Sequence, residues 1–203
     1  MRKLILILLL SIAMNAQNNG IYKPNSEIVN AEASIIIPIG NLSNKFDYAQ
    51  SYGFWFKIGE DNGFAANVGF NALFLKNARP IDYEFNDSIY SIDSNKFGFD
   101  IGIRAIKVIP ISKNQKNYLE FGLTIGIDYL DYDFPSEETN NENDKEKYDP
   151  YKNASILLAP EIKYMYDNIG LKFQYRYTPY GFNEEFESKF GSSSISFGIV
   201  YKQ

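Results

Sequence analysis

The sequence contains no cysteine and no histidine among its 203 residues. Without cysteine it has no disulfide framework, no thiolate nucleophile and no cysteine metal site. Without histidine it lacks the commonest general base and the commonest metal ligand, so serine–histidine hydrolytic mechanisms are excluded. The formal net charge of −5 argues against a nucleic-acid binder, which needs a basic face. The composition therefore predicts a protein that is not an enzyme, carries no cofactor or metal and binds no nucleic acid.

Long apolar runs are also missing, apart from a short one at the N-terminus. The basic pair Arg2-Lys3 precedes an apolar stretch over 4–14, and small residues follow it. The apolar core, about eleven residues, is too short for the roughly 20 that a spanning helix needs. The order of basic, apolar and small residues is typical of a secretory signal peptide. We predict a signal peptide over 1–16, cleaved after Ala16, with cleavage after Ala13 as the alternative.

Aromatic residues and period-two alternation are abundant. The sixteen Tyr, sixteen Phe and one Trp favour strands over helices. Beyond Val29, apolar residues alternate with small or polar ones in eight segments, which predicts eight strands. Most of these segments reach the about 9 to 11 residues that a tilted membrane strand requires. The predicted strands cover about 30–39, 51–58, 64–74, 97–104, 119–129, 154–166, 169–177 and 194–202.

The connections between the predicted strands alternate in length. Such alternation is typical of an outer-membrane barrel, with long loops outside and tight turns on the periplasmic side. We therefore predict an all-β fold, an eight-stranded antiparallel up-and-down transmembrane β-barrel with both termini in the periplasm. The long connections cover about 40–50, 76–95, 131–152 and 179–192, and the short ones about 59–63, 110–117 and 167–168.

The two faces of each predicted strand differ in size and polarity. One face is large and often aromatic, and the other carries small or charged residues. Because eight strands enclose a narrow interior, the large apolar set would overfill it, whereas the polar set fits. We therefore predict that the apolar face points outward into lipid. Amphipathic rings prefer the membrane interfaces, so we expect Tyr52, Tyr129 and Tyr177 at the outer one, and Tyr166 and Tyr201 at the inner one.

The polar faces carry ten charged residues into the predicted interior, five acids and five bases. Charges held away from bulk water must pair or hydrogen-bond, because otherwise they are costly. We predict that they interlock and close the lumen; the alternative is that several lie solvated at the rims. The predicted network consists of Asp100, Arg104, Glu120, Asp128, Glu161, Lys163, Lys172 and Arg176, with Glu32 and Lys57 completing the ten.

Three positions fit the barrel pattern poorly. Pro160 lies inside the strand over 154–166, where its missing N–H would break a ladder bond, so we expect a β-bulge there. Trp55 falls on the inward face of its strand, where an indole is tight. Gln203 holds the last outward position, which leaves Tyr201 as the final aromatic residue of the closing strand.

Two long connections could carry binding chemistry. The segment 131–152 has eight acids and three bases, and such carboxylates could attract hydrated Ca²⁺ or Mg²⁺. Asp131 and Asp133 could in principle do acid–base work. A flexible solvated loop explains the same composition. The aromatic residues of 179–192 could form a binding surface, cap the barrel mouth or dip into the lipid interface.

Three segments carry a family resemblance. They are Asn15-Ala16-Gln17 at the predicted cleavage site, Ile37-Pro38-Ile39-Gly40-Asn41-Leu42 at the close of the first strand, and the closing strand Ser194–Tyr201. Together with the pattern of the whole mature chain, they resemble the OmpX- and PorT-like eight-stranded outer-membrane barrels of Gram-negative bacteria. The resemblance implies a barrel surrounded by outer-membrane lipid and inserted by the barrel-assembly machinery.

The chain is thus divided into a signal peptide over 1–16, a periplasmic segment over 17–29 and an outer-membrane β-barrel domain over 30–203. Four roles stay open. The residues favour a structural or surface-interaction barrel with a closed lumen. The alternatives are a narrow porin-like transport or ligand-binding barrel, a soluble carrier, and a subunit of an envelope or secretion complex, which only the resemblance suggests. The outward aromatic face argues against the soluble carrier.

Overall fold

The structure is a computed structural model, and it describes residues 28–61, 63–85, 88–112, 116–133, 154–180 and 191–203. The predicted signal peptide and most of the predicted periplasmic segment lie outside the described residues, as do most of the connections over 131–152 and 179–192. In the parts of the chain that are described, no helix has the length and the apolar character needed to cross a membrane.

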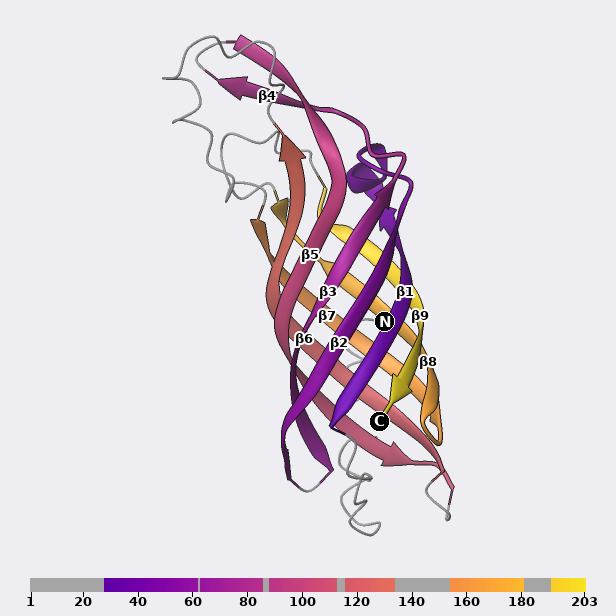
Figure 1. The fold of residues 1–203 in the computed structure, drawn as a ribbon. Helices are drawn as coiled ribbons and strands as arrows, with labels where there is room; N and C mark the ends of the chain where they lie inside the picture. The colour runs from indigo at the N-terminus through magenta and orange to yellow at the C-terminus, as the bar shows by residue number, and fades with distance from the viewer. Residues whose placement is uncertain (1–27, 62, 86–87, 113–115, 134–153, 181–190) are drawn as a thin grey trace, which may run out of the picture.

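Eight of the described strands close into a barrel (Figure 1). Each barrel strand pairs antiparallel with the next barrel strand in the chain, and β9 pairs with β1 to complete the ring. The predicted eight-stranded antiparallel up-and-down barrel is therefore confirmed. The described elements are β1 (Val29–Ile39), the 3-10 helix η2 (Gly40–Asn44), β2 (Tyr48–Asp61), β3 (Phe64–Lys76), β4 (Ile81–Phe85), β5 (Ser88–Pro110), β6 (Asn117–Asp133), β7 (Ala154–Tyr166), β8 (Ile169–Tyr177) and β9 (Ser193–Lys202).

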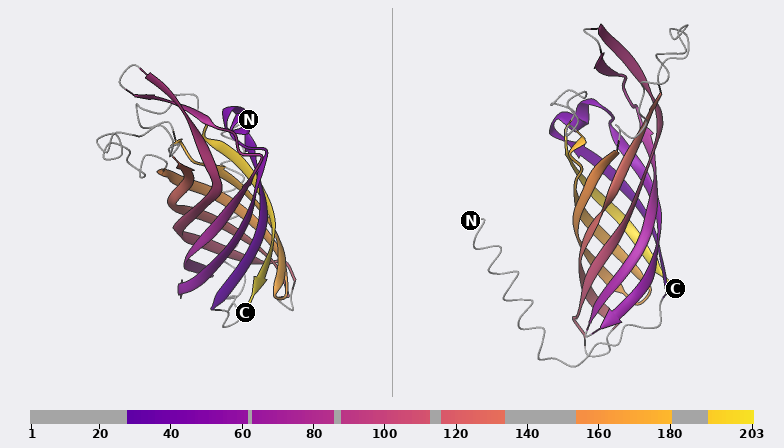
Figure 2. Two further views of the ribbon diagram at one scale, coloured as in Figure 1. Left: turned by 45° about the horizontal axis from the view of Figure 1, so that its top comes forward. Right: turned by 90° about the vertical axis from the view of Figure 1, so that its left-hand side faces the viewer.

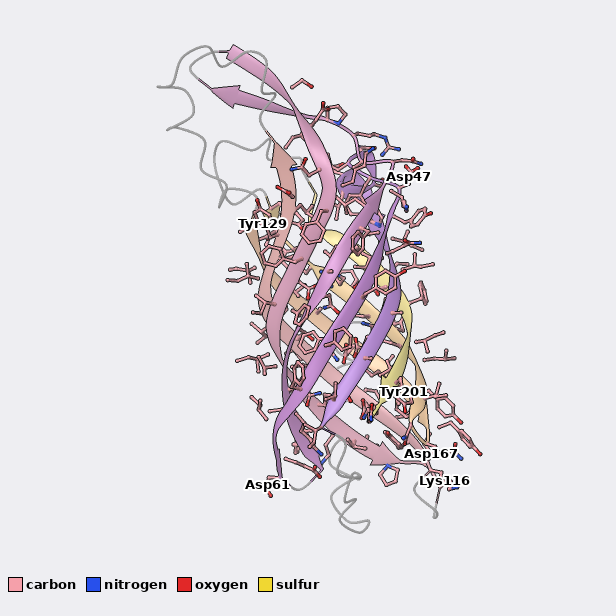
Figure 3. The ribbon with its side chains drawn as sticks, viewed as in Figure 1. Asp47, Asp61, Lys116, Tyr129, Asp167 and Tyr201 are labelled. Atoms are coloured by element: carbon pink, nitrogen blue, oxygen red, sulfur yellow. The ribbon has the colours of Figure 1, made fainter. Side chains whose placement is uncertain are left out.

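The barrel has a turn end and a loop end, which Figure 2 shows from two further directions. The ends of β2, β5 and β7 and the starts of β3, β6 and β8 lie at the turn end, and η2 and β4 lie at the loop end (Figure 1). Figure 3 places Asp61, Lys116 and Asp167 near the turn end, and Asp47 and Tyr129 near the loop end. Because the number of barrel strands is even, the start of β1 and the end of β9 lie at the same end of the barrel. There the Ile28 amide donates a hydrogen bond to the Gln203 carbonyl at 2.9 Å.

The connection predicted over 76–95 is wrong in part, because it contains a further strand. β4 pairs with the first part of β5, from Ile81 opposite Ile92 to Phe85 opposite Ser88. This hairpin reaches beyond the barrel (Figure 1). A register shift between Ser94 and Gly98 in the β5–β6 ladder marks the level at which it departs, since a bulge bends its strand. Ile81, Tyr83 and Phe85 alternate with Asp82 and Glu84, so the sequence carries a strand signal here that the assignment of 76–95 to a loop overlooks.

The bulge expected at Pro160 is also wrong. The ladder from β7 to β6 runs through Pro160, which lies opposite Leu123, with no shift in register. On the other side, Leu158 pairs with Tyr177 and Glu161 pairs with Gln174 in one unbroken register, and the two positions between have no pairing partner in β8. The missing proline N–H thus leaves a gap in one ladder instead of displacing the strand.

The predicted polarity of the two faces is confirmed. Outward residues such as Phe70 and Ile125 are 47% and 56% exposed, whereas the inward neighbours Asn71 and Thr124 are 4% and 1% exposed. Aromatic rings pair across strands on the outer face, as Phe173 does with the ring of Phe197 at 5.1 Å. The large apolar surface therefore lies outside the barrel and the polar one inside. The tyrosines that are exposed at outward positions include Tyr52, Tyr166, Tyr177 and Tyr201, while Tyr129 is half-buried against Phe99.

Candidate functional site

Nine of the ten charged residues predicted to face inward are buried inside the barrel. They come from five strands, β1, β5, β6, β7 and β8, and none is more than 6% exposed. Each follows from the period-two geometry of its strand, because the residues on either side of it point outward. The nine are Glu32, Asp100, Arg104, Glu120, Asp128, Glu161, Lys163, Lys172 and Arg176.

Glu32 is the hub of the network. One carboxylate oxygen, Oε1, lies 2.5 Å from Arg104 Nη1 and 2.9 Å from Lys163 Nζ, and Oε2 lies 2.7 Å from Lys172 Nζ. These three cations stand on β5, β7 and β8, whereas Glu32 stands on β1. A single carboxylate therefore ties together strands on opposite sides of the barrel wall, and the ion pairs cross the lumen.

Glu161 shares two of these cations and extends the network. Its Oε1 lies 3.1 Å from Arg104 Nε and 3.0 Å from Lys163 Nζ, while Gln174 Nε2 donates to its Oε2 at 3.1 Å. Lys163 Nζ also lies 4.0 Å from Glu120 Oε2. Two acids thus share two cations, an arrangement in which neither charge depends on a single partner.

Lys202 joins the network through an ion pair and hydrogen bond to Glu120. The alternation of the last strand places Lys202 on its polar face, but Lys202 is not among the ten charges predicted for the interior. In the structure it is 6% exposed, because β9 runs to its end in register with β1, Asn30 opposite Lys202. The alternation was a sufficient signal for its inward direction.

A second group of charges lies nearer the loop end. Arg176 Nη1 lies 2.9 Å from Asp100 Oδ2, and Arg176 also forms an ion pair with Asp128. Asn71 Nδ2 donates to Asp100 Oδ1 at 2.5 Å, and the Tyr180 hydroxyl donates to Asp128. Of the roles expected for the aromatic residues of 179–192, Tyr180 takes that of a cap over the barrel interior. Phe182, Phe186 and Phe190 lie outside the described residues.

Lys57 is the one predicted charge that the structure does not bring into the network. Its side chain is 21% exposed, and its Nζ lies 3.0 Å from Oε2 of Glu60, near the end of the same strand. A register shift between Lys57 and Gly59 interrupts the β2–β3 ladder here, and the pairing resumes from Gly59 to Asp61. Lys57 therefore belongs to the rim, and Lys202 takes its place, so that five acids still face five bases inside.

Trp55 lies inside the barrel, where the sequence analysis found an indole tight. It is 1% exposed, and the Arg104 guanidinium lies 3.7 Å from the centre of its ring. Gly69 on the neighbouring strand provides the room: a Cβ there would come within 2.5 Å of Trp55 Cδ2. The indole is therefore a platform that holds the guanidinium in place, through a cation–π contact of the kind that is strongest with tryptophan.

Apolar residues close both ends of the charged interior, which the sequence analysis missed. The loop-end apolar cluster contains side chains from four barrel strands together with residues of the connections. The turn-end apolar cluster is smaller. Two cavities beside the network are small, with volumes of about 10 Å³ and 20 Å³, near the space that one water molecule needs. The loop-end cluster is Ile36, Leu42, Phe46, Ala49, Leu73, Leu75, Ile81, Leu130 and Tyr180; the turn-end cluster is Ile106, Val108, Tyr118, Met165 and Val200.

The other predicted chemistry lies largely beyond the described residues. No group of three or more acidic side chains within the described ranges is placed to hold a metal ion. Asp131 Oδ2 accepts a hydrogen bond from Asn95 at 3.0 Å, and the side chain of Asp133 is outside the described set, as is most of the acidic connection. The possible acid–base pair and the attraction of Ca²⁺ or Mg²⁺ therefore stay predictions.

A cluster of exposed polar groups joins two connections at the loop end. Asp47 precedes β2, and its carboxylate accepts hydrogen bonds from Asn77 Nδ2 at 2.6 Å and from Arg79 Nη2 at 2.5 Å. These bonds favour the ionised form, so they hold the pKa of the Asp47 carboxyl below its ordinary value of 3.8. The stabilisation they give is therefore complete above pH 3.8 and is lost as the pH falls below that value.

Replacing Asn77 by glycine is expected to raise the pKa of Asp47, because the hydrogen bond that contributes most to the lowering of this pKa disappears. Glycine suits the backbone at this position, whose φ is 51°. The titration can be followed by carboxyl ¹³C resonances. Asn41→Gly, at an exposed asparagine of the connection between β1 and β2 that contains Asp47, is the control. An unchanged midpoint in Asn77→Gly would show that the amide does not set the pKa.

The sequence and the structure were compared with known proteins. No family model matches the chain, and no curated protein matches it. Among solved structures, Neisserial surface protein A is 15% identical with a TM-score of 0.43, and covers 87% of this chain and 97% of its own. The Yersinia pestis outer membrane protein Ail is 11% identical with a TM-score of 0.42, and covers 88% of this chain and 100% of its own. The NanC porin is 13% identical with a TM-score of 0.27, and covers 86% of this chain and 99% of its own.

The chain is similar to these proteins. Its architecture is defined by the pairing of its own strands. The ladders form one closed antiparallel ring, the outer surface is apolar and aromatic, and the inner surface is charged and paired. The chain is an all-β protein of eight antiparallel strands closed into a barrel, the fold that its resemblance to small outer-membrane barrels implied.

Proposed function

We propose that this protein is a non-enzymatic β-barrel of a Gram-negative outer membrane, with a structural or surface-interaction role and a closed lumen. The observation that carries the proposal is the polarity of the barrel. Large apolar side chains cover the outside, and charges fill the inside. A soluble protein rarely exposes a continuous apolar surface of this kind, whereas lipid favours it. We propose export by the signal peptide over 1–16 and insertion by the barrel-assembly machinery.

The closed strand ring supports this location independently of side chains. In hydrocarbon every backbone N–H and C=O group must be paired within the protein, and a closed barrel is one of two structures that achieve this. β1 and β9 pair over ten residue positions, from Asn30 with Lys202 to Ile39 with Ser193, so the ring has no open edge at the point where chain start and chain end meet.

The surface role rests on the parts beyond the ring. The β4–β5 hairpin projects past the loop end, where a partner or ligand outside the cell could reach it (Figure 2). A narrow porin-like transport barrel is the second candidate, and a subunit of an envelope or secretion complex is a third. The paired interior opposes the transport candidate, because ten charged side chains occupy the lumen and apolar clusters lie at both ends of it.

Planar-bilayer recording tests the closed lumen. The refolded protein, checked for folding by its heat-modifiable migration on a gel, is expected to give no steady conductance of porin size, since an eight-stranded interior is just filled by side chains. A lipid bilayer without protein is the control. Steady single-channel steps would contradict the closed lumen and favour the transport candidate. Free solubility without detergent, with no heat-dependent shift, would contradict the membrane location itself.

A further inference from the structure

The connection between β1 and β2, residues 40–47, folds inward over the mouth of the barrel. Leu42 and Phe46 are 2% and 3% exposed, and they belong to the loop-end apolar cluster with Leu73 and Leu130. Leu130 stands on β6, which lies opposite β1 in the ring, four strands away in either direction. Two side chains from outside the sheet thus share one buried apolar cluster with a residue of the opposite wall.

Exposed hydrogen bonds at the rim fasten this segment to the connection after β3. Arg79 donates from Nη1 to the Ser43 carbonyl at 3.0 Å and from its amide to the Lys45 carbonyl at 2.8 Å. Its guanidinium also pairs with Asp47, which accepts from Asn77 as described above. The side chains of this rim clamp, Arg79 and Asp47, are 46% and 41% exposed. Exposed pairs of this kind are weak, because water competes for both partners.

The inner surface of the barrel beneath residues 40–47 is concave, and we call this concave surface the cup. Its walls are the inward apolar side chains of the barrel strands, and a cavity of about 10 Å³ remains between Leu42, Phe46 and the polar floor. The floor includes Arg176 and Asp128, which are fully paired with each other and their neighbours. Removing the two apolar side chains would therefore expose the cup without leaving the charges beneath it unpaired.

From this arrangement we infer that residues 40–47 form a removable plug. Breaking the rim clamp frees the segment, and Leu42 and Phe46 leave the mouth while all eight strand ladders stay intact. The segment has no partner in the barrel ladders. Its backbone bond to a barrel strand runs from the Asp47 amide to the Lys76 carbonyl at 3.1 Å, so its movement leaves the ladders themselves intact. The inference rests on the proposed closed barrel. It adds that the loop end can open to solvent down to the charged residues beneath the cup.

Cysteine labelling tests the plug, and the absence of native cysteine removes any background. Ser194 is 2% exposed and lines the cavity beneath the plug, so Ser194→Cys reports opening at small steric cost. Ser196, 1% exposed and two residues further toward the turn end of β9, lies opposite Gln174 of the network. Ser196→Cys therefore reports opening of the charged interior. Both variants are placed in lipid nanodiscs and treated with a water-soluble maleimide.

We expect Ser194→Cys to react slowly, and its rate to rise by about fivefold or more when Asp47→Ala removes the clamp, since a small loss of stability shifts a two-state equilibrium several-fold. Asp61→Ala, at an exposed carboxylate of the turn end, should leave the rate unchanged. Ser196→Cys should stay protected in every background.

The two proposals fail in different ways. An unchanged Ser194→Cys rate in the Asp47→Ala background, or rapid labelling with the clamp intact, would overturn the plug alone. Labelling of Ser196→Cys in the otherwise unaltered barrel would overturn the closed lumen. Equal acceleration at both positions in Asp47→Ala would show loosening of the whole barrel, and would overturn the plug as a separate element.

Discussion

Replacing Glu32 by glutamine is expected to destabilise the barrel by about 3–5 kcal/mol, the usual cost of removing one partner from a buried ion pair. The carboxylate holds Arg104, Lys163 and Lys172 at 2.5 to 2.9 Å, and all three cations are buried. Glutamine keeps the size of the side chain but gives up its charge. The three cations would then repel one another around a neutral amide, with Glu161 and Glu120 as their remaining acids.

The measurement is equilibrium unfolding in urea, followed by fluorescence. The chain has one tryptophan, and Trp55 lies against Arg104, so its emission reports the network directly. Glu60→Gln is the control, because Glu60 pairs with Lys57 at the partly exposed end of β2, and surface pairs contribute about 0–1 kcal/mol. If the free energy of unfolding of Glu32→Gln lies within about 1 kcal/mol of that of the parent protein, the ion-pair network does not determine the stability of the barrel.

A second substitution in the same background separates charge from packing. Lys172→Met removes one of the surplus cations and keeps a flexible side chain of similar length. Combined with Glu32→Gln, it should recover part of the lost stability, since unpaired buried charge is the origin of the cost. By contrast, Arg104→Ala leaves Glu32 with two lysines and Glu161 with one, so the charge component of its effect is smaller than that of Glu32→Gln.

The barrel could be predicted from the sequence because two physical constraints apply to every strand. The period of two fixes which residues share a face, and the narrow interior of eight strands decides which face points inward. Lys163 and Ile162 show this well: one residue apart, they are 0% and 36% exposed. The inward direction of nine of the ten charges followed from the same two facts.

The partners of those charges could not be predicted in the same way. Which side chains meet across the lumen depends on the stagger of the ring, and one sequence does not reveal it. The pairing of Glu32 with Lys172 joins residues 140 positions apart. The apolar plug was missed for a different reason. Leu42 and Phe46 lie in a connection, where alternation has no meaning, and their burial depends on the barrel mouth that the other strands build.

An arginine in place of Val68 is expected to destabilise the barrel or block its insertion, at a cost of roughly 2–4 kcal/mol near the bilayer midplane. Val68 faces outward on β3, between Phe56 and Ile103 of the neighbouring strands. It stands in the band of large apolar side chains, several residues from both ends of its strand. In the proposed membrane location, a guanidinium there would face hydrocarbon and the apolar side chains of the neighbouring strands. Its side chain would have to reach along the barrel surface to find water or headgroups.

Ser91→Arg is the matched control, since Ser91 is an exposed strand residue in the part of β5 that pairs with β4 beyond the barrel. The folded fraction of both variants can be read from heat-modifiable migration after refolding into lipid vesicles, and their stability from unfolding in urea. Only Val68→Arg should lose folded protein, because under the proposed membrane location only that position would lie in lipid. If both variants fold equally well, the outer face of β3 does not meet hydrocarbon. The apolar surface would then need another cover, and the membrane location proposed for this barrel would fail with it.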